Sequence, residues 1–166
     1  MTLMVGSKVI YPNQGLCLID SIVQKEIGGQ VINFYQLALL DESGGELFVP
    51  VEKAHASGLR QLLSEAELQQ LLNRFKQPSN ESKDWKQRAN ENSKRLASGS
   101  AFDLAEVVES LTVLSHTKEL SFREGQMLEK ARKLLISEIA EVISKPKSAA
   151  EELIHEALQK RSVASA

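Results

Sequence analysis

A chain of 166 residues with 42% hydrophobic and 25% charged side chains has the composition of a soluble globular protein, with room for one domain or two small ones. Its formal net charge of −2 argues against a protein that coats nucleic acid, so we expect any DNA contact to be local and assisted by a partner. The single cysteine, Cys17, the lack of an apolar run of roughly 18 residues and the lack of a signal-peptide pattern predict a cytoplasmic protein without membrane contact.

The first 51 residues have the pattern of short β-strands, because they are rich in Val, Ile, Phe and Tyr and are divided by turn signals. The predicted strands are Lys8–Tyr11, Leu16–Val23, Val31–Leu40 and Glu46–Val51. The predicted turns lie at Pro12–Gly15, Gly28-Gly29 and Ser43-Gly44-Gly45. This spacing predicts a small, strongly bent antiparallel sheet or partial barrel, whose edge strands are natural places for a partner to dock.

From Ser64 onward the pattern is helical. A serine stands three residues before a carboxylate at Ser64…Glu67, Ser100…Asp103, Ser121…Glu124 and Ser148…Glu151. The three pairs that end in Glu fit the sequence form of a capping box, and the pair with Asp103 is a shorter, weaker version. These starts predict helices over 64–75, 83–97, 100–115, 121–144 and 148–161. Two apolar stripes predict the faces that form the core. The first contains Leu104, Val107, Val108, Leu111 and Leu114, and the second contains Leu128, Ala131, Leu135, Ile139 and Val142.

The only tryptophan, Trp85, lies in the most basic stretch of the chain. The segment Arg74–Arg95 holds seven Lys or Arg residues and three carboxylates, and seven minus three gives a local charge of +4. An aromatic ring among cations suits a nucleic-acid edge, where the cations hold phosphate and the ring wedges or stacks. At helical spacing, however, Trp85 shares a face with Ala89, Asn92 and Leu96, which is typical of a core position. The residues alone leave both interpretations open.

No residue pattern predicts catalysis. The histidines His55, His116 and His155 are scattered, no serine lies in a nucleophile elbow, and the glycine pairs lack the lysine and the helix of a phosphate loop. We therefore expect a protein that is not an enzyme and that binds neither a metal ion nor a cofactor.

A set of short motifs occurs in a fixed order along most of the chain. The first motif of the set is Val5-Gly6-Ser7-Lys8-Val9-Ile10-Tyr11-Pro12-Asn13-Gln14-Gly15. The set continues with Phe34-Tyr35, Phe48-Val49-Pro50, Gly58-Leu59-Arg60, Trp85-Lys86-Gln87-Arg88, Leu96-Ala97-Ser98-Gly99-Ser100, Ala105-Glu106-Val107-Val108, Leu120-Ser121, Met127-Leu128 and Lys130-Ala131-Arg132. It resembles the CarD/CdnL family of bacterial transcription regulators over about residues 3–143. The N-terminal module of that family is shared with transcription-repair coupling factors.

The resemblance implies an α+β fold, in which a small N-terminal Tudor-like antiparallel β sheet or partial barrel precedes a C-terminal all-α helical domain. We expect residues 1–60 to interact with RNA polymerase, residues 61–145 to form a helical DNA-binding domain, and residues 146–166 to form a C-terminal extension with a short helix. In the family the sheet binds the lobe of the polymerase β subunit. A tryptophan of the helical domain, at the position of Trp85, stabilises the open promoter complex from the minor groove at the upstream edge of the bubble.

Two sets of contact residues follow from this interpretation. The predicted polymerase-binding residues are Lys25, Leu37, Phe48 and Pro50, and the predicted DNA-binding residues are Trp85, Lys86, Arg88, Lys94 and Arg95. For the first set, Phe48 precedes a strand end at Pro50, and an edge that ends at proline is open to a partner. Alternation with Leu47 and Val49 leaves open that Phe48 points into the core.

The chain departs from the family mainly in its basic residues. Gln87 stands at a usual arginine position, Ala89 and Asn90 replace an aromatic and a basic residue, and neutral residues occupy Thr112–Ser115 and Gly125-Gln126. We therefore expect a monomer whose contact with promoter DNA is weak, not sequence-specific and assisted by polymerase. The alternative is a diverged polymerase-binding protein whose helical domain contacts another protein and binds DNA weakly or not at all.

Overall fold

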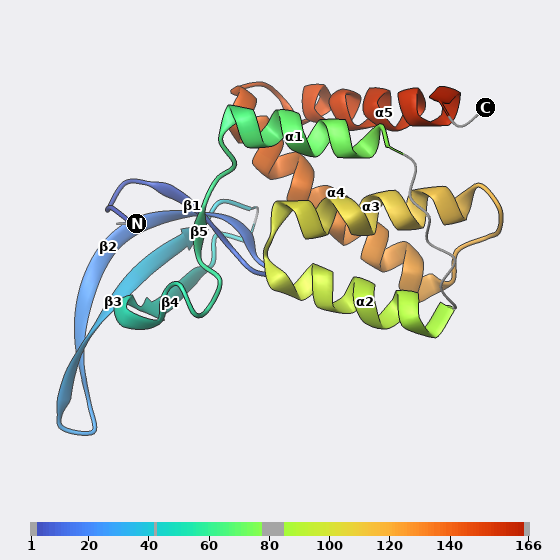
Figure 1. The fold of residues 1–166 in the computed structure, drawn as a ribbon. Helices are drawn as coiled ribbons and strands as arrows, with labels where there is room; N and C mark the ends of the chain where they lie inside the picture. Colours follow the sequence, from blue (N-terminus) through green and yellow to red (C-terminus); the bar gives the residue numbers. More distant parts are fainter. Residues whose placement is uncertain (1–2, 42, 78–84, 165–166) are drawn as a thin grey trace. The chain divides into compact units, whose positions relative to one another are not determined.

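The computed structural model describes residues 3–41, 43–77 and 85–164, without the side chains of residues 85, 86 and 161–164. The chain forms two compact units, Met1–Leu62 and Leu63–Ala166. The first is an antiparallel sheet and the second is a set of helices, as Figure 1 shows. This arrangement confirms the α+β fold class predicted from the sequence.

The sheet has five strands in the order β4-β3-β2-β1-β5. Its strands are β1 (Lys8–Tyr11), β2 (Gly15–Ile27), β3 (Gln30–Leu39), β4 (Glu46–Pro50) and β5 (Arg60–Gln61), and a short 3-10 helix, η1, covers Val51–Lys53. The first four strands were predicted. The two residues of β5 are too few to leave a sequence pattern, but they pair with Val9 and Ile10 of β1. Because of this pairing, the first unit includes residues 60 and 61.

Strands β2 and β3 form a long hairpin that extends beyond the shorter strands of the sheet (Figure 1). Its two-residue turn is Gly28-Gly29, and both glycines have positive φ angles, 59° and 81°, as a tight hairpin of this kind requires. Asp20 forms a bulge, because the register passes from Ile19 opposite Leu37 to Ser21 opposite Gln36. The bulge reverses which residues of β2 face the core, and β2 runs four residues further than predicted.

One face of the sheet carries the core of the first unit. Its fully buried side chains include Val9, Cys17, Ile19 and Leu37, and Ala54 and Leu59 cover them from the segment after β4. Burial raises the pKa of the Cys17 thiol to about 11, and the charge of Asp41 acts in the same direction. The thiol is therefore protonated at neutral pH.

The helices of the second unit begin and end within three residues of the predicted positions. They are α1 (Glu65–Phe75), α2 (Trp85–Ser98), α3 (Ala101–Ser115), α4 (Phe122–Ile143) and α5 (Lys147–Ala164). Complete capping boxes begin α1 at Ser64 and α4 at Ser121, and the Ser100 hydroxyl accepts from the N–H of Asp103 at the start of α3. The predicted cap at Ser148 is wrong, because α5 begins at Lys147 and Ser148 already lies inside it.

The helical core contains residues of both predicted stripes. Its buried members include Leu104, Val107, Val108, Leu111, Ala131, Leu135 and Ile139. Helix α5, which we had expected in a C-terminal extension, adds Ala150, Ile154 and Ala157 to the same core. The buried carboxylate of Glu138 accepts a hydrogen bond of 2.9 Å from the N–H of Leu63, which fixes the first residue of this unit to α4. None of the described helices is both long and apolar enough to cross a lipid bilayer.

Candidate functional site

The strand register places several predicted contact residues on the face of the sheet opposite its core. Lys25 pairs with Ile32, Phe34 pairs with Pro50, and Gln36 pairs with Phe48. Because directly paired residues point to the same side, these side chains share one surface. This surface, called the outer face here, consists of Val23, Lys25, Ile32, Phe34, Phe48 and Pro50.

The outer face presents a cation stacked on aromatic rings. The Lys25 ammonium lies 3.8 Å from the centre of the Phe48 ring and 5.8 Å from that of Phe34. The Phe48 side chain is 42% exposed, whereas its neighbour Val49 is buried. Phe48 therefore points away from the core, and the alternative left open by the sequence is excluded. A cation–π contact at an exposed site contributes about 0.5–1 kcal/mol, which favours the position of Lys25 over the ring.

Leu37 does not belong to this surface. It pairs with Ile19 and Leu47 on the core face, and its side chain is completely buried. Its prediction as a contact residue is therefore wrong, because the alternation of the strand places its side chain on the core face. Leu37 supports the outer face from within the core. Phe34, which we did not predict, takes its place beside Lys25.

Strand β4 gives the outer face an open edge. It lies at one end of the strand order, and it ends at Pro50. An edge strand has backbone groups that point away from its neighbour and can accept a further strand. The outer face and this edge meet at Phe48 and Pro50, so a partner strand paired to β4 would also contact the aromatic ring.

Helix α2 begins at Trp85, but the side chains of Trp85 and Lys86 lie outside the described residues, so the DNA contacts expected of these two residues stay predictions. Further along this helix, Asn92 is 2% exposed and Leu96 packs against the helical core. The face that the sequence grouped with Trp85 thus points inward at residues 92 and 96.

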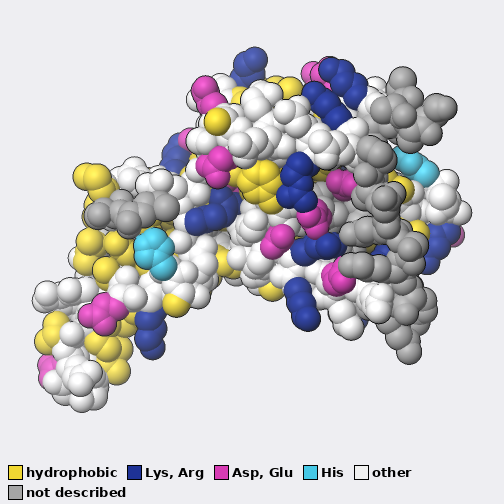
Figure 2. Space-filling view, in the orientation of Figure 1, with side chains coloured by type: hydrophobic (Ala, Val, Ile, Leu, Met, Phe, Trp, Pro, Cys, Tyr) yellow, Lys and Arg dark blue, Asp and Glu magenta, His cyan; other side chains and the backbone are white. Residues whose placement is uncertain are grey.

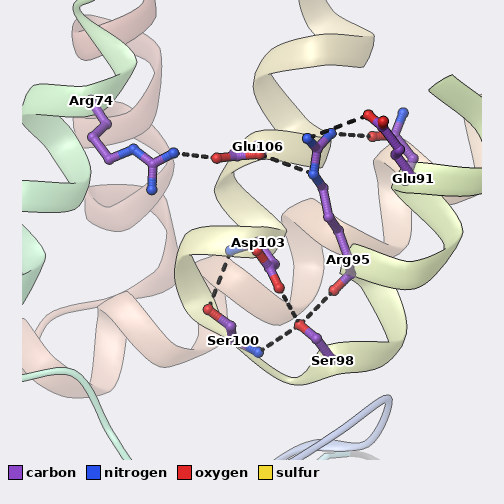
Figure 3. Close-up of polar contacts among 8 residues, drawn as sticks. Arg74, Glu91, Arg95, Ser98, Ser100, Asp103 and Glu106 are labelled. Carbon is purple, nitrogen blue, oxygen red and sulfur yellow. Dashed lines mark hydrogen bonds and ion pairs between the residues drawn. The ribbon is translucent and has the colours of Figure 1, made fainter. Parts of the chain in front are cut away.

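Arg95, a predicted DNA contact, is held inside the helical unit by carboxylates (Figure 3). Its Nε lies 2.9 Å from Oε2 of Glu106 on α3, and a second nitrogen lies 3.7 Å from Oε2 of Glu91. Glu106 also binds Arg74 of α1 through its other oxygen. The Arg95 side chain is only 19% exposed, so its charge is largely compensated within the protein. It fixes α2 to α3.

The junction of α2 and α3 is held by serines. The hydroxyl of Ser98 donates to Oδ2 of Asp103 at 2.7 Å and accepts from the N–H of Ser100, as Figure 3 shows. Between these serines, Gly99 has a φ of 81°, which glycine adopts without strain. Together with the Arg95–Glu106 pair, these contacts set the direction in which α2 runs back to Trp85.

The other described cations of α2 differ in their surroundings. Lys94 is exposed, whereas Arg88 is half-buried, and its positive charge helps to lower the pKa of the Glu124 carboxyl. The pKa of the Glu124 carboxyl is lowered mainly by the hydrogen bond from the backbone of Ser121, and Lys118 and Arg88 add to this effect. On the face seen in Figure 2, basic and acidic side chains are interspersed over the helical unit. Glu106 lies outside the segment Arg74–Arg95 and pairs with both of these arginines, so the local charge of +4 counted for that segment is partly neutralised.

Two family models match consecutive parts of the chain. The model for the CarD-like/TRCF RID domain matches residues 3–63, and the model for the CarD C-terminal domain matches residues 67–155. The second match extends into α5, further than the motifs of the sequence had indicated. The chain is 29% identical over 136 residues to YdeB of Bacillus subtilis (strain 168), named as a candidate transcription factor, and the match covers 81% of this chain and 88% of YdeB.

A solved structure also matches part of this chain. It is the solution NMR structure of the 72-residue N-terminal domain of CarD from Myxococcus xanthus, which is 40% identical to the matched part of this chain. The match covers 36% of this chain and 79% of that domain, with a TM-score of 0.31.

Proposed function

This chain belongs to the CarD family, and we propose that it is a transcription regulator that binds the β subunit of RNA polymerase and stabilises the open promoter complex. The observation that carries this proposal is the outer face of the sheet, where Lys25 covers the exposed ring of Phe48 beside the open edge of β4. An exposed aromatic anchor next to a strand edge combines the two features by which a sheet recognises a protein partner.

In the proposed complex the helical unit acts on DNA through the start of α2. Trp85 inserts at the upstream edge of the bubble, and Lys86, Arg88 and Lys94 lie near phosphates. Arg95 has a different role from the one predicted, because its ion pair with Glu106 holds α2 in place. An inserted ring slows the closing of a distorted step, and cations beside it hold the backbone without reading sequence. Attachment to polymerase raises the local concentration of the helical unit, so weak DNA binding is sufficient.

A second candidate function is that the helical unit contacts a protein in place of DNA. Phe122 at the start of α4 is 82% exposed, a degree of exposure that favours a protein contact at a site distinct from α2. In this second candidate function the chain still binds polymerase through the outer face, while its helical unit contacts another protein and contributes little to DNA binding.

Co-purification with core RNA polymerase tests the first step. The Phe48→Asp variant is expected to lose binding, because a charge replaces the exposed ring. Val31→Asp is the matched control, since Val31 is 67% exposed and lies on β3, on the opposite face of the sheet. Both variants must give the circular dichroism spectrum of the native protein. Normal binding by a folded Phe48→Asp variant would remove the outer face from the proposal.

Open-complex lifetime tests the second step. With polymerase and a promoter, the native chain is expected to lengthen this lifetime, and Trp85→Ala is expected to shorten it. If the native chain binds polymerase but leaves the lifetime unchanged at low and high salt, the protein-contact alternative is favoured.

A further inference from the structure

A groove lies between α4 and α5, away from the residues considered above. Its volume is about 520 Å³, and it is lined by residues of α4 from Gly125 to Ser137 and by Lys147 and Glu151 of α5. The lining residues of α4 recur every three or four positions, so they form one stripe along the helix. From residue 125 to residue 137 this stripe is about 18 Å long at 1.5 Å per residue. Such a shape fits an elongated segment better than a compact small molecule.

The chemistry of the groove is that of a protein-binding surface with a basic rim. Leu128 and Ile136 form an apolar floor, and Arg132, Lys133 and Lys147 outnumber the two lining carboxylates. The apolar floor of Leu128 and Ile136 favours a protein segment over the phosphate backbone of a nucleic acid. An amphipathic helix with apolar residues on one side and acidic residues beside them matches both the floor and the rim.

Phe122 lies just beyond the lining residues of the groove, at the start of α4. It lies three residues before Gly125, on the same side of α4, and its side chain is 82% exposed. A large aromatic side chain at the end of an apolar stripe has the position of an interface anchor. The groove and Phe122 together are called the α4 surface here.

Gly125 provides an independent observation. Within a helix a glycine costs up to about 1 kcal/mol relative to alanine. A β-carbon built at Gly125 would meet no atom within 4 Å, so internal packing does not require glycine at this position. A glycine that the fold does not need, on the wall of a groove, allows another backbone to approach closely.

We propose that the α4 surface binds an acidic amphipathic helix of the RNA polymerase holoenzyme, a second contact that rests on the function proposed above. The outer face supplies the first contact, and the α4 surface adds affinity once the chain is attached.

Binding to purified holoenzyme without DNA tests this proposal, because any effect of a cation is then not due to phosphate. Phe122→Ala, Gly125→Ala and Lys133→Glu are each expected to weaken binding about fivefold or more, as loss of an interface anchor does. Lys130→Glu is the matched control, since Lys130 is exposed on α4 but does not line the groove. Gly125→Ala is the most specific variant, because it should stabilise the protein while it weakens binding.

Each result decides the proposal. The proposal is overturned if Phe122→Ala and Lys133→Glu bind the holoenzyme normally. It is also overturned if Lys130→Glu weakens binding as much as they do, or if the variants weaken binding only when promoter DNA is added. If Phe48→Asp abolishes binding while the α4 variants bind normally, this inference alone fails. If the native chain does not bind holoenzyme at all, the proposed function fails and this inference falls with it.

Discussion

Arg95 on α2 and Glu106 on α3 form an ion pair, with Nε and Oε2 2.9 Å apart, in which both side chains are less than one third exposed. Glu106 also binds Arg74, so one carboxylate connects α1, α2 and α3. A half-buried carboxylate between two guanidinium groups is stabilised by both, and its loss leaves two like charges close together. The pair thus links the proposed DNA-binding helix to the rest of the helical unit.

Glu106→Gln is therefore expected to lower the free energy of unfolding by about 1–2 kcal/mol, between the values for exposed and for fully buried pairs. Chemical denaturation of the full chain measures this loss. Glu156→Gln makes the same chemical change at an exposed position of α5 and should leave stability unchanged. An equal effect of the two variants would mean that the carboxylate of Glu106 has no special role.

The buried Cys17 thiol predicts a pH dependence of stability. Its pKa rises from an ordinary value of 9.0 to about 11 in the folded protein. Between these values the unfolded chain releases the thiol proton while the folded chain keeps it, so unfolding becomes easier as the pH rises above 9. Between pH 9 and pH 11 the loss in the free energy of unfolding approaches about 2–3 kcal/mol, and below pH 9 this loss disappears.

Urea denaturation of the native chain and of Cys17→Ala at pH 8, 9 and 10 separates this effect from the titration of lysines and tyrosines. The difference in the free energy of unfolding between the native chain and Cys17→Ala should become smaller as the pH rises, because only the native chain has the thiol. A constant difference would show that the thiol does not titrate differently in the two states.

The sequence predicted most elements of this fold, because strand and helix periods are local properties of the chain. It could not predict β5, since the two residues of that strand are defined only by pairing with β1. The bulge at Asp20 also escaped, because it depends on the register between two strands. In the candidate site, too, contacts that depend on the pairing of strands could not be predicted from the sequence. Phe48 was predicted and Phe34 was not, since only pairing places Phe34 beside Lys25.

Charge was the least predictable property. Arg95 looked like a DNA contact because it follows Lys94 in a basic stretch, whereas Glu106 lies eleven residues later in the chain, on the next helix. Leu37 shows the same problem for an apolar residue, because a shift of one position in a strand exchanges the two faces. Local patterns thus indicate which elements form, and tertiary contacts decide which side chains are available to a partner.

The two units are expected to fold separately, because each has its own core. A fragment of residues 63–166 should unfold cooperatively and retain the helix content of that unit. In the full chain, limited proteolysis should cut between the units or in the segment 77–82 before it cuts within α3 or α4. First cleavage inside residues 100–143 would contradict this division of the chain.

Trp85→Ala gives the decisive prediction for DNA. We expect Trp85 to be exposed at the start of α2, so the variant should lose little stability, yet it should shorten the open-complex lifetime on polymerase. Trp85→Phe, which keeps an aromatic ring, should retain part of that lifetime. Binding to DNA without polymerase should be weak and have a shallow salt dependence, because Gln87 and Asn90 are neutral and Arg95 is paired with Glu106, so few counterions are released. If Trp85→Ala instead loses the roughly 3–5 kcal/mol expected for truncation of a buried tryptophan, its ring belongs to the core and cannot act as the wedge.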